Sequence, residues 1–328
     1  MKPALLDILR CPRCHGALTL LGEPGDDTGE VEKGELSCHG CDDRYPIVDY
    51  IPRFVGGDNY ADSFSLEWSR FRTTQLDSST GVAISRDRFF AETRWKPDDL
   101  RGSLVLDVGC GSGRFVEVAL AAGAHVVALD YSGAVDACRL NFGAHPNLDI
   151  VQGDICHLPF RSGAFDFVYC LGVLQHTPDV RRSFLSLPEV LRPGGHLAVD
   201  AYPKKRFRAL WPKYLLRRVT RFLSPGRLFR VVQVATGPLL ALSNVIDRIP
   251  VHGRRLRHVV PVANYRGVYP LDEARLREFA VLDTFDMFSP AYDQPQTAAT
   301  LRSWFHEAGL ADVEVAEEGL VVGRATKP

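Results

Sequence analysis

The sequence has almost no net charge, and it lacks long apolar runs, internal repeats and low-complexity segments. Lysine and arginine number 39 against 40 aspartates and glutamates, which argues against a protein built wholly around nucleic acid. No stretch of 18 or more residues is continuously apolar, so we expect no transmembrane helix. The beginning, MKPALLDILRCPRC, has one lysine and a short apolar run interrupted by Asp7, which is not the pattern of a signal peptide.

The number of cysteines and the lack of a secretion signal indicate the cellular compartment of the protein. Eight cysteines without a secretion signal predict a reducing, cytoplasmic compartment, where paired cysteines bind metal more often than they form disulfides. The 328 residues, 45% of them hydrophobic, are enough for a sizeable core, and the length suits about two domains or one large domain with additions.

Four of the cysteines form two Cys-x-x-Cys pairs near the start of the chain. They are Cys11, Cys14, Cys38 and Cys41. Two such pairs at this separation are typical of a tetrahedral zinc ribbon, whereas a single pair would fit a redox site as well. Because four thiols complete the zinc coordination, we expect the adjacent His15 and His39 to be bystanders.

The segment YPIVDYIPRFV, Tyr45 to Val55, predicts a strand followed by a proline-marked turn. Together with the cysteines it resembles the zinc-ribbon domain of the small subunit that activates several eukaryotic methyltransferases. It is also similar to the ribbon heading a bacterial ribosomal-RNA guanine methyltransferase. Both resemblances cover about 55 residues and imply methylation without defining a substrate.

A glycine-rich turn follows an apolar run in VLDVGCGSGRF, Val105 to Phe115, and a helical pattern comes after it. Strand, glycine turn and helix in this order indicate a nucleotide-type site. We expect Gly109 to permit the tight turn, Gly111 to let a ligand approach the backbone, and Gly113 to allow close helix packing.

A second strand, HVVALD, ends at Asp130, where a carboxylate can bind ribose hydroxyls. Asp107 lies just before the first glycine, and its charge disfavours a pyrophosphate. It favours a ligand with an ammonium group, held directly or through water.

These segments resemble the ordered motifs of class I S-adenosylmethionine-dependent methyltransferases. Further matches are VQGDICHLPF, FDFVYCLGVLQH and LRPGGHLAVDAY. The resemblance implies S-adenosylmethionine as cofactor and S-adenosylhomocysteine as product. The cofactor-binding residues that it implies are Asp107, Gly109, Cys110, Gly111, Gly113, Asp130, Tyr131, Asp154, Ile155 and Leu171.

The same resemblance implies an α/β fold, with a Rossmann-like sheet covered by helices on both faces. We expect a zinc ribbon at 1–56, a helical connector at 57–100, the cofactor-binding core at 101–202, a largely helical insertion at 203–296, and a closing helix and hairpin at 297–328. Connector aromatics at helical spacing either pack onto the core or roof the cofactor pocket. The candidates for the roof are Tyr60, Trp68, Arg72 and Gln75.

The insertion is expected to be a lid or substrate-binding subdomain. Its first part, residues 204–230, is basic and amphipathic and fits a solvated helical cap, anionic lipid, a phosphate-bearing substrate or RNA. A nearly uncharged second part suggests packed helices, which could also line an apolar tunnel. Residues 283–297 show no helical or strand period, which indicates a loop. Asn264, Tyr265 and Arg266 are candidates for binding on similar terms to the residues of that segment.

Candidate catalytic residues follow from the chemistry of methyl transfer, in which an oxygen nucleophile needs a base. His176 follows the fourth strand and is the candidate base; it could instead contact cofactor or cap a helix. Asp286, Tyr292 and Asp293 are candidates from the 283–297 segment.

We therefore predict a methyltransferase acting on an oxygen or nitrogen of a small metabolite, a sugar-bearing precursor or a lipid-linked precursor. One alternative is an RNA methyltransferase that holds nucleic acid with its ribbon and basic insertion. The other is a non-catalytic nucleoside-binding partner protein. The oligomeric state does not follow from the sequence.

Overall fold

The computed structural model describes residues 1–22, 29–56, 60–205 and 211–328. Arg206 and Arg208 of the predicted basic helix lie outside these residues. The elements are β1 (Leu18–Leu21), β2 (Gly34–Cys38), β3 (Arg44–Val48), β4 (Ile51–Pro52), α1 (Asp62–Arg70), α2 (Asp77–Thr80), α3 (Ile84–Thr93), α4 (Pro97–Leu100), β5 (Leu104–Val108), α5 (Arg114–Ala121), β6 (His125–Asp130), α6 (Ala134–Phe142), β7 (Leu148–Gln152), β8 (Phe165–Cys170), α7 (Val180–Val190), β9 (Leu191–Ala201), α8 (Pro212–Thr220), α9 (Pro225–Asp247), α10 (Gly253–Leu256), α11 (Glu273–Phe288), α12 (Ala298–Glu307), β10 (Ala311–Glu318) and β11 (Leu320–Thr326).

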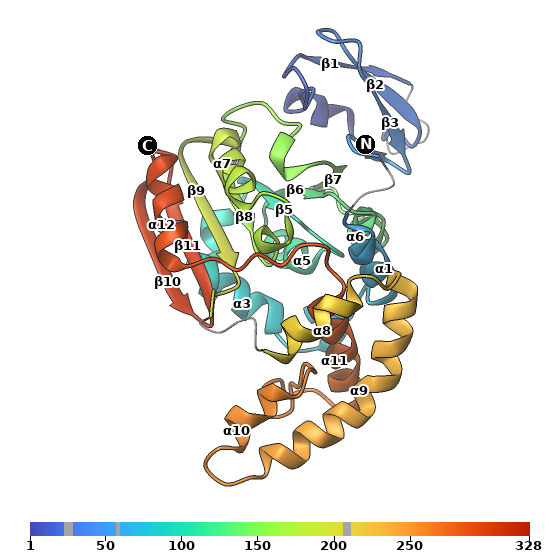
Figure 1. Cartoon of the computed structure of the whole chain (residues 1–328). Helices are drawn as coiled ribbons and strands as arrows, with labels where there is room; N and C mark the ends of the chain where they lie inside the picture. Colours follow the sequence, from blue (N-terminus) through green and yellow to red (C-terminus); the bar gives the residue numbers. More distant parts are fainter. Residues whose placement is uncertain (23–28, 57–59, 206–210) are drawn as a thin grey trace.

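Seven strands form the central sheet in the order β10-β11-β9-β8-β5-β6-β7. The five strands from β9 to β7 are parallel, whereas β11 and β10 add an antiparallel hairpin at the edge. The predicted Rossmann-like sheet is confirmed (Figure 1). The chain order reverses between β5 and β8, and ligands bind at the carboxyl ends of the strands beside such a point.

Helices cover both faces of this sheet, which explains why its inner strands read as continuous apolar runs. Successive side chains of β5 point to opposite faces. Leu106 packs in one cluster with Phe184 of α7. Val105 packs in the other cluster with Phe89 of α3 and Val116 of α5.

The ribbon is a four-stranded antiparallel sheet in the order β1-β2-β3-β4. The turn after β3 differs from the prediction: Asp49 and Tyr50 form it with positive φ angles, and the proline that follows lies in β4. The ribbon packs against the β7 edge of the core, where the Phe54 amide donates to the Gln152 carbonyl at 2.8 Å.

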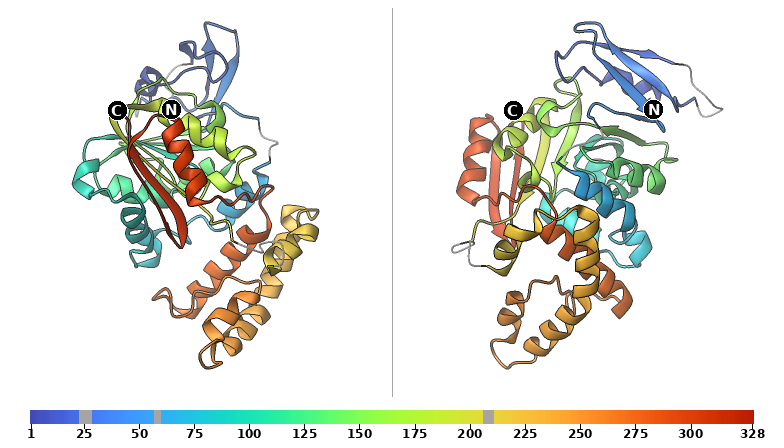
Figure 2. Two further views of the ribbon diagram at one scale, coloured as in Figure 1. Left: turned by 60° about the vertical axis from the view of Figure 1, so that its left-hand side comes forward. Right: turned by 45° about the vertical axis from the view of Figure 1, so that its right-hand side comes forward.

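The insertion contributes α8, α9, α10 and α11 and projects from the core at the end opposite to the ribbon (Figures 1 and 2). The prediction of a loop from residue 283 was wrong in its first part, because residues 283–288 complete α11. This helix begins after Asp272, whose side chain accepts a hydrogen bond from the Arg275 amide. Its buried residues lie on several sides because it packs between other helices, and this removes the amphipathic period.

The second part of the insertion also differs from the packed helices that we expected. Helix α9 buries one side through Leu228, Phe229 and Val232, but Val234 on another side is 77% exposed. By length and composition alone α9 could cross a membrane, a property that it shares with many core helices of soluble proteins. Our criterion of continuous apolar residues missed it because polar residues interrupt the helix.

Candidate active site and metal centre

A cavity of about 470 Å³ opens at the carboxyl ends of β5, β6 and β8. Its walls come from the glycine turn, from the connector around α1, and from the insertion around α11. Tyr60, Trp68 and Gln75 of the connector line it, as the roof hypothesis supposed; Arg72 is not a lining residue.

The glycine turn forms one wall because side chains would not fit there. Gly109 has a φ of +88°, and a Cβ on it would lie 2.2 Å from Val173 Cγ2. Gly111 has a φ of +53°, and its Cβ would lie 3.1 Å from the Trp68 indole. Gly113 does not line the cavity; its Cβ would lie 2.7 Å from an aromatic ring of α6. Two glycines therefore expose backbone to a ligand, and the third permits helix packing.

Asp130 lies at the end of β6 and lines the cavity. Its carboxylate accepts hydrogen bonds from the amides of Gly111 at 2.9 Å and Ser132 at 2.8 Å. Burial raises the pKa of Asp130. The next residue, Tyr131, stacks on Tyr60 with ring centroids 4.7 Å apart. A carboxylate and a flat aromatic surface beside an open backbone suit the ribose and base of a nucleoside.

The other residues of the predicted cofactor set lie partly on the wall and partly behind it. Cys110, Ile155 and Leu171 line the cavity. Asp154 does not, and its side chain caps the 3-10 turn that follows by accepting a backbone hydrogen bond. Asp107 also lies behind the wall and is 2% exposed; burial raises its pKa to about 8. One Asp107 oxygen has no hydrogen-bond partner among the described residues, as expected of a group awaiting a cationic ligand or water.

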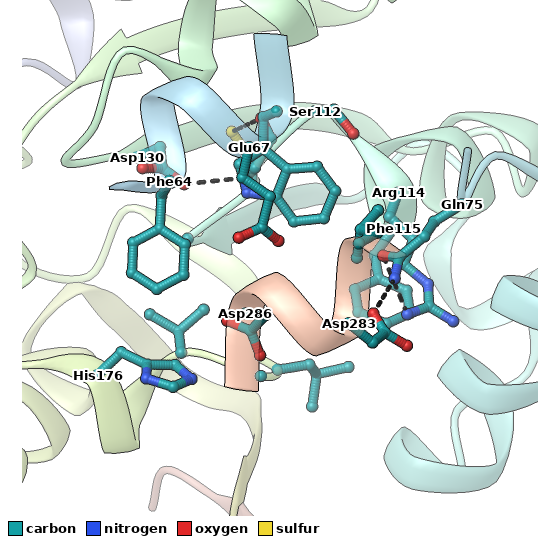
Figure 3. A pocket seen from close by; sticks show the side chains of 18 of the residues that line it. Phe64, Glu67, Gln75, Ser112, Arg114, Phe115, Asp130, His176, Asp283 and Asp286 are labelled. Atoms are coloured by element: carbon teal, nitrogen blue, oxygen red, sulfur yellow. Dashed lines mark hydrogen bonds between the residues drawn. The ribbon is translucent and has the colours of Figure 1, made fainter. Parts of the chain in front are cut away.

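Three carboxylates line the cavity: Glu67 of α1, and Asp283 and Asp286 of α11. Figure 3 shows Glu67 beside Ser112 of the glycine turn and pointing toward the helix that carries Asp283 and Asp286. Asp286 accepts a hydrogen bond from the Tyr202 hydroxyl at 3.3 Å. Asp283 accepts a hydrogen bond from the Tyr265 hydroxyl, and a second one, at 3.3 Å, from the side-chain nitrogen Nε2 of Gln75.

Burial and mutual repulsion keep part of this cluster protonated. Glu67 is 1% exposed, and its pKa is raised well above the usual value by burial and then by the charges of Asp286 and Asp283. Burial, opposed by the hydrogen bond from Tyr265, raises the pKa of Asp283 to about 6. Such a cluster can both donate and accept hydrogen bonds, and it attracts a cation.

His176 lines the same part of the cavity from a 3-10 turn after β8. Its Nδ1 lies 3.0 Å from the backbone carbonyl of Tyr292. A carbonyl can only accept, so Nδ1 carries a proton and Nε2 is left as the acceptor of the neutral ring. The ring is held edge-on between Phe64 and Tyr202. Tyr292 itself does not line the cavity, and its side chain packs edge-on against Tyr60.

The remaining candidates of the insertion have structural partners. Asp293 forms an ion pair with Lys213 at 2.6 Å, and Asn264 donates to Ser243 and Asn244. Sequence reasoning missed Glu67, although it named its neighbour Trp68. It also missed several cavity-lining residues from distant elements: Arg88, Arg114, Tyr202, Tyr269 and Asp283.

The sulfur atoms of Cys11, Cys14, Cys38 and Cys41 all lie within 4.8 Å of one another. Four thiols in this arrangement suit tetrahedral Zn²⁺. A Cβ on Gly16 would lie 3.2 Å, and one on Gly40 3.1 Å, from the Cys14 sulfur, so both glycines give the cluster room. Among the described residues, no histidine joins the cluster.

Comparisons with known proteins match both halves of this description. Residues 106–199 match the methyltransferase domain family, and residues 2–49 match the Trm112p-like protein family. The chain is 31% identical to the ubiquinone biosynthesis O-methyltransferase of Aromatoleum aromaticum, across 44% of this chain and 69% of the relative. It is 37% identical to the sterol 24-C-methyltransferase of Schizosaccharomyces pombe, across 48% of this chain and 44% of the relative. A solved S-adenosylmethionine-dependent methyltransferase from Aquifex aeolicus aligns with a TM-score of 0.42 and 13% identity, across 83% of this chain and 100% of the other.

Proposed function

Because the chain belongs to the class I S-adenosylmethionine-dependent methyltransferases and carries a zinc ribbon, we propose that it methylates an oxygen or nitrogen of a small, sugar-bearing or lipid-linked precursor. The observation that carries the proposal is that His176 and three carboxylates line the same cavity as the glycine turn. One half of the cavity suits the cofactor, and the other offers a base and polar partners for an acceptor.

In the cofactor half, Gly109, Gly111 and Asp130 would hold the nucleoside. Cys110, Tyr131, Ile155 and Leu171 line the same cavity. Asp107, whose raised pKa keeps it largely protonated in the free chain, would balance the positive charge of the cofactor from behind the wall once it loses that proton. When bound, S-adenosylmethionine supplies an electrophilic methyl group, so the protein's main task is to align the acceptor.

In the acceptor half, Asp286 and Glu67 would receive hydrogen bonds from a hydroxyl or an ammonium group. His176 would then take the proton on Nε2, because its Nδ1 is committed to the Tyr292 carbonyl. Tyr292 thus acts through its backbone as a positioning residue. Asp286 would stabilise the imidazolium that forms, whereas the raised pKa of Glu67 leaves Glu67 as a neutral hydrogen-bonding group.

The apolar remainder of the acceptor half supports an acceptor with a lipid portion. Phe64, Phe279, Leu282 and Met287 line the cavity beside the carboxylates. Relatives of the chain are named for ubiquinone, sterol and demethylmenaquinone, which are all apolar lipids. We extend this substrate class, but no individual compound, to the present chain.

The four cysteines would hold one structural Zn²⁺ that anchors the ribbon, a segment with little core of its own. The ribbon matches the Trm112p-like family, and RNA remains the alternative acceptor because the ribbon also resembles that of a ribosomal-RNA guanine methyltransferase and residues 204–230 are basic. A clamp formed by both the ribbon and the basic insertion is unfavourable, since they lie at opposite ends of the molecule (Figure 2).

The proposal is tested by incubating the protein with methyl-labelled S-adenosylmethionine and a cell extract separated into RNA, protein, small-molecule and lipid fractions. We expect label in the lipid or small-molecule fraction. Label that nuclease removes would replace the proposal with the RNA alternative. Cofactor binding without label in any fraction would favour a non-catalytic partner protein.

The base is tested with His176→Ala, and His306→Ala on the exposed side of α12 is the matched control. General-base catalysis contributes about 10²–10⁴-fold, so turnover by His176→Ala should fall in that range at nearly unchanged cofactor affinity. Turnover equal to that of the control would refute the base.

A further inference from the structure

The part of the insertion before α11, residues 203–262, has a charge composition opposite to that of the rest of the chain. Residues 203–262 contain 14 lysines and arginines and a single acidic residue, Asp247. The rest of the chain therefore holds 25 of the 39 basic residues and 39 of the 40 acidic residues. The near-zero net charge conceals a strongly basic subdomain on an acidic enzyme.

The same subdomain exposes large apolar side chains in an ordered pattern. Along α9 and its end, Val231, Val234, Leu242, Val245 and Ile249 are between 47% and 77% exposed. They follow one another at intervals of three, four or eight residues, so all five side chains lie within an arc of roughly 100° around the helix axis. An exposed apolar stripe of this length is unusual on a surface that faces only water.

Helix α8 and the residues after it continue this character. Leu215, Val219 and Phe222 are 44%, 68% and 76% exposed. Arg218 and Arg221 are exposed between them. Basic and apolar side chains on one helix face are the mark of a helix that lies in a membrane interface.

The packing of α9 decides between lying on a membrane and crossing one. Phe229 is buried against Phe71 of the connector and Phe285 of α11. A helix in the bilayer core would have to give up these contacts with the enzyme. The exposed apolar stripe of α9 can instead insert into the headgroup region of a membrane, while the buried side of the helix remains packed against the enzyme.

We propose that the exposed face of α8 and α9, together with their basic residues, docks the enzyme on an anionic membrane surface. RNA is a weaker partner for this face, because phosphates would satisfy the arginines but leave the valines, leucines and phenylalanine without an apolar environment. Lipid satisfies both kinds of side chain.

The docking face is joined directly to the cavity. Lys213 of α8 lines the cavity, whereas Leu215 and Val219 of the same helix belong to the exposed face. A membrane contact would therefore lie within a few helical turns of the acceptor half. The inference holds for any acceptor, because it concerns where the enzyme binds and not what it methylates.

The test is sedimentation of the full-length protein with vesicles of phosphatidylcholine, with and without about one third phosphatidylglycerol. We expect binding to the anionic vesicles that weakens as salt rises. Arg218→Ala with Arg221→Ala should weaken binding about fivefold per arginine, the equivalent of about 1 kcal/mol each. Val234→Ser with Val245→Ser should also weaken it several-fold, since each removes an exposed apolar group.

The control is Leu140→Ser on α6, where the leucine is 72% exposed but outside the docking face; it should bind as the unchanged protein does. All substitutions are at exposed positions, and equal melting temperatures would verify folding. Absence of binding to anionic vesicles would overturn the proposal, as would equal losses in Leu140→Ser. Tight binding of an RNA oligonucleotide that excludes vesicles would assign the face to nucleic acid instead. The assay contains no acceptor, so its result is separate from that of the transfer assay.

Discussion

The glycine turn permits a quantitative test, in which Gly109 is replaced by alanine. Two costs are expected. The φ of +88° lies in the left-handed region, where a Cβ costs roughly 1–2 kcal/mol. The new Cβ would also lie 2.2 and 2.8 Å from the two methyl carbons of Val173, and overpacking of this kind costs about 1–3 kcal/mol. Gly109→Ala should therefore lower the free energy of unfolding by about 2–5 kcal/mol.

A double-mutant cycle with Val173→Ala separates the two costs. Removing the methyl groups of Val173 relieves the contact but leaves the backbone strain. Gly109→Ala should thus cost only about 1–2 kcal/mol when it is made in the Val173→Ala background. Gly102→Ala is the matched control, because Gly102 has a φ of +71° with no atom within 4 Å of the added Cβ. It should show the strain cost alone.

Urea unfolding of the five proteins measures these free energies, and calorimetric titration gives the dissociation constant of S-adenosylmethionine. A weaker affinity is expected in Gly109→Ala, since the clash with Val173 must displace residues that line the cavity, and partial recovery is expected in the double variant. If Gly109→Ala costs the same in both backgrounds, Val173 does not set the shape of the turn and the argument fails.

Three further predictions concern the cofactor and the metal. Asp130→Ala should raise the dissociation constant of S-adenosylmethionine about 10- to 100-fold, the worth of one or two hydrogen bonds to a charged group; unchanged affinity in calorimetry would contradict the placement of the ribose. The pKa of Asp107 is raised to about 8 on folding, so the folded chain retains a proton that the unfolded chain loses, and stability should fall as pH rises from about 4 to 8. Asp107→Asn should flatten this dependence in urea unfolding at a series of pH values, and an unaltered slope would refute the raised pKa. Cys38→Ser should lose bound zinc by atomic absorption and lower the melting temperature, whereas Cys156→Ser, outside the cluster, should keep its zinc.

The glycine turn was predictable because its signals are local. The backbone at Gly109, Gly111 and Gly113 has positive φ angles. Residues with a side chain disfavour this conformation, so the turn geometry can be recognised from the glycines in the sequence. The paired cysteines are recognisable in the same way, since the short spacing within each pair is what brings two sulfurs to one metal. Such signals need only a short stretch of chain.

The part of the cavity that we propose for the acceptor was predictable only in part, because burial depends on what packs from elsewhere. Glu67 reads as the polar side of α1, yet it is 1% exposed, since α11 lies over it. Asp286 was named as a loop residue and lies on a helix instead. Apolar side chains surround that helix on several sides, and the periodic pattern that marks a surface helix is lost.

This difference between the halves bears on how such an enzyme could change its acceptor. Under the proposed division of the cavity, residues 105–155 would supply most of the cofactor wall, whereas Glu67, His176 and Asp286, which line the cavity from three distant elements, would reach the acceptor. The contact between α1 and α11 brings two of them together, so the insertion can be altered without disturbing the glycine turn. Replacing residues that α11 presents to the cavity, such as Leu282 and Met287, should therefore change which acceptors are methylated while the affinity for S-adenosylmethionine stays within a few-fold. If cofactor affinity collapsed together with acceptor preference, the two halves would be coupled through α11, and the insertion would be part of the cofactor site rather than a separate acceptor wall.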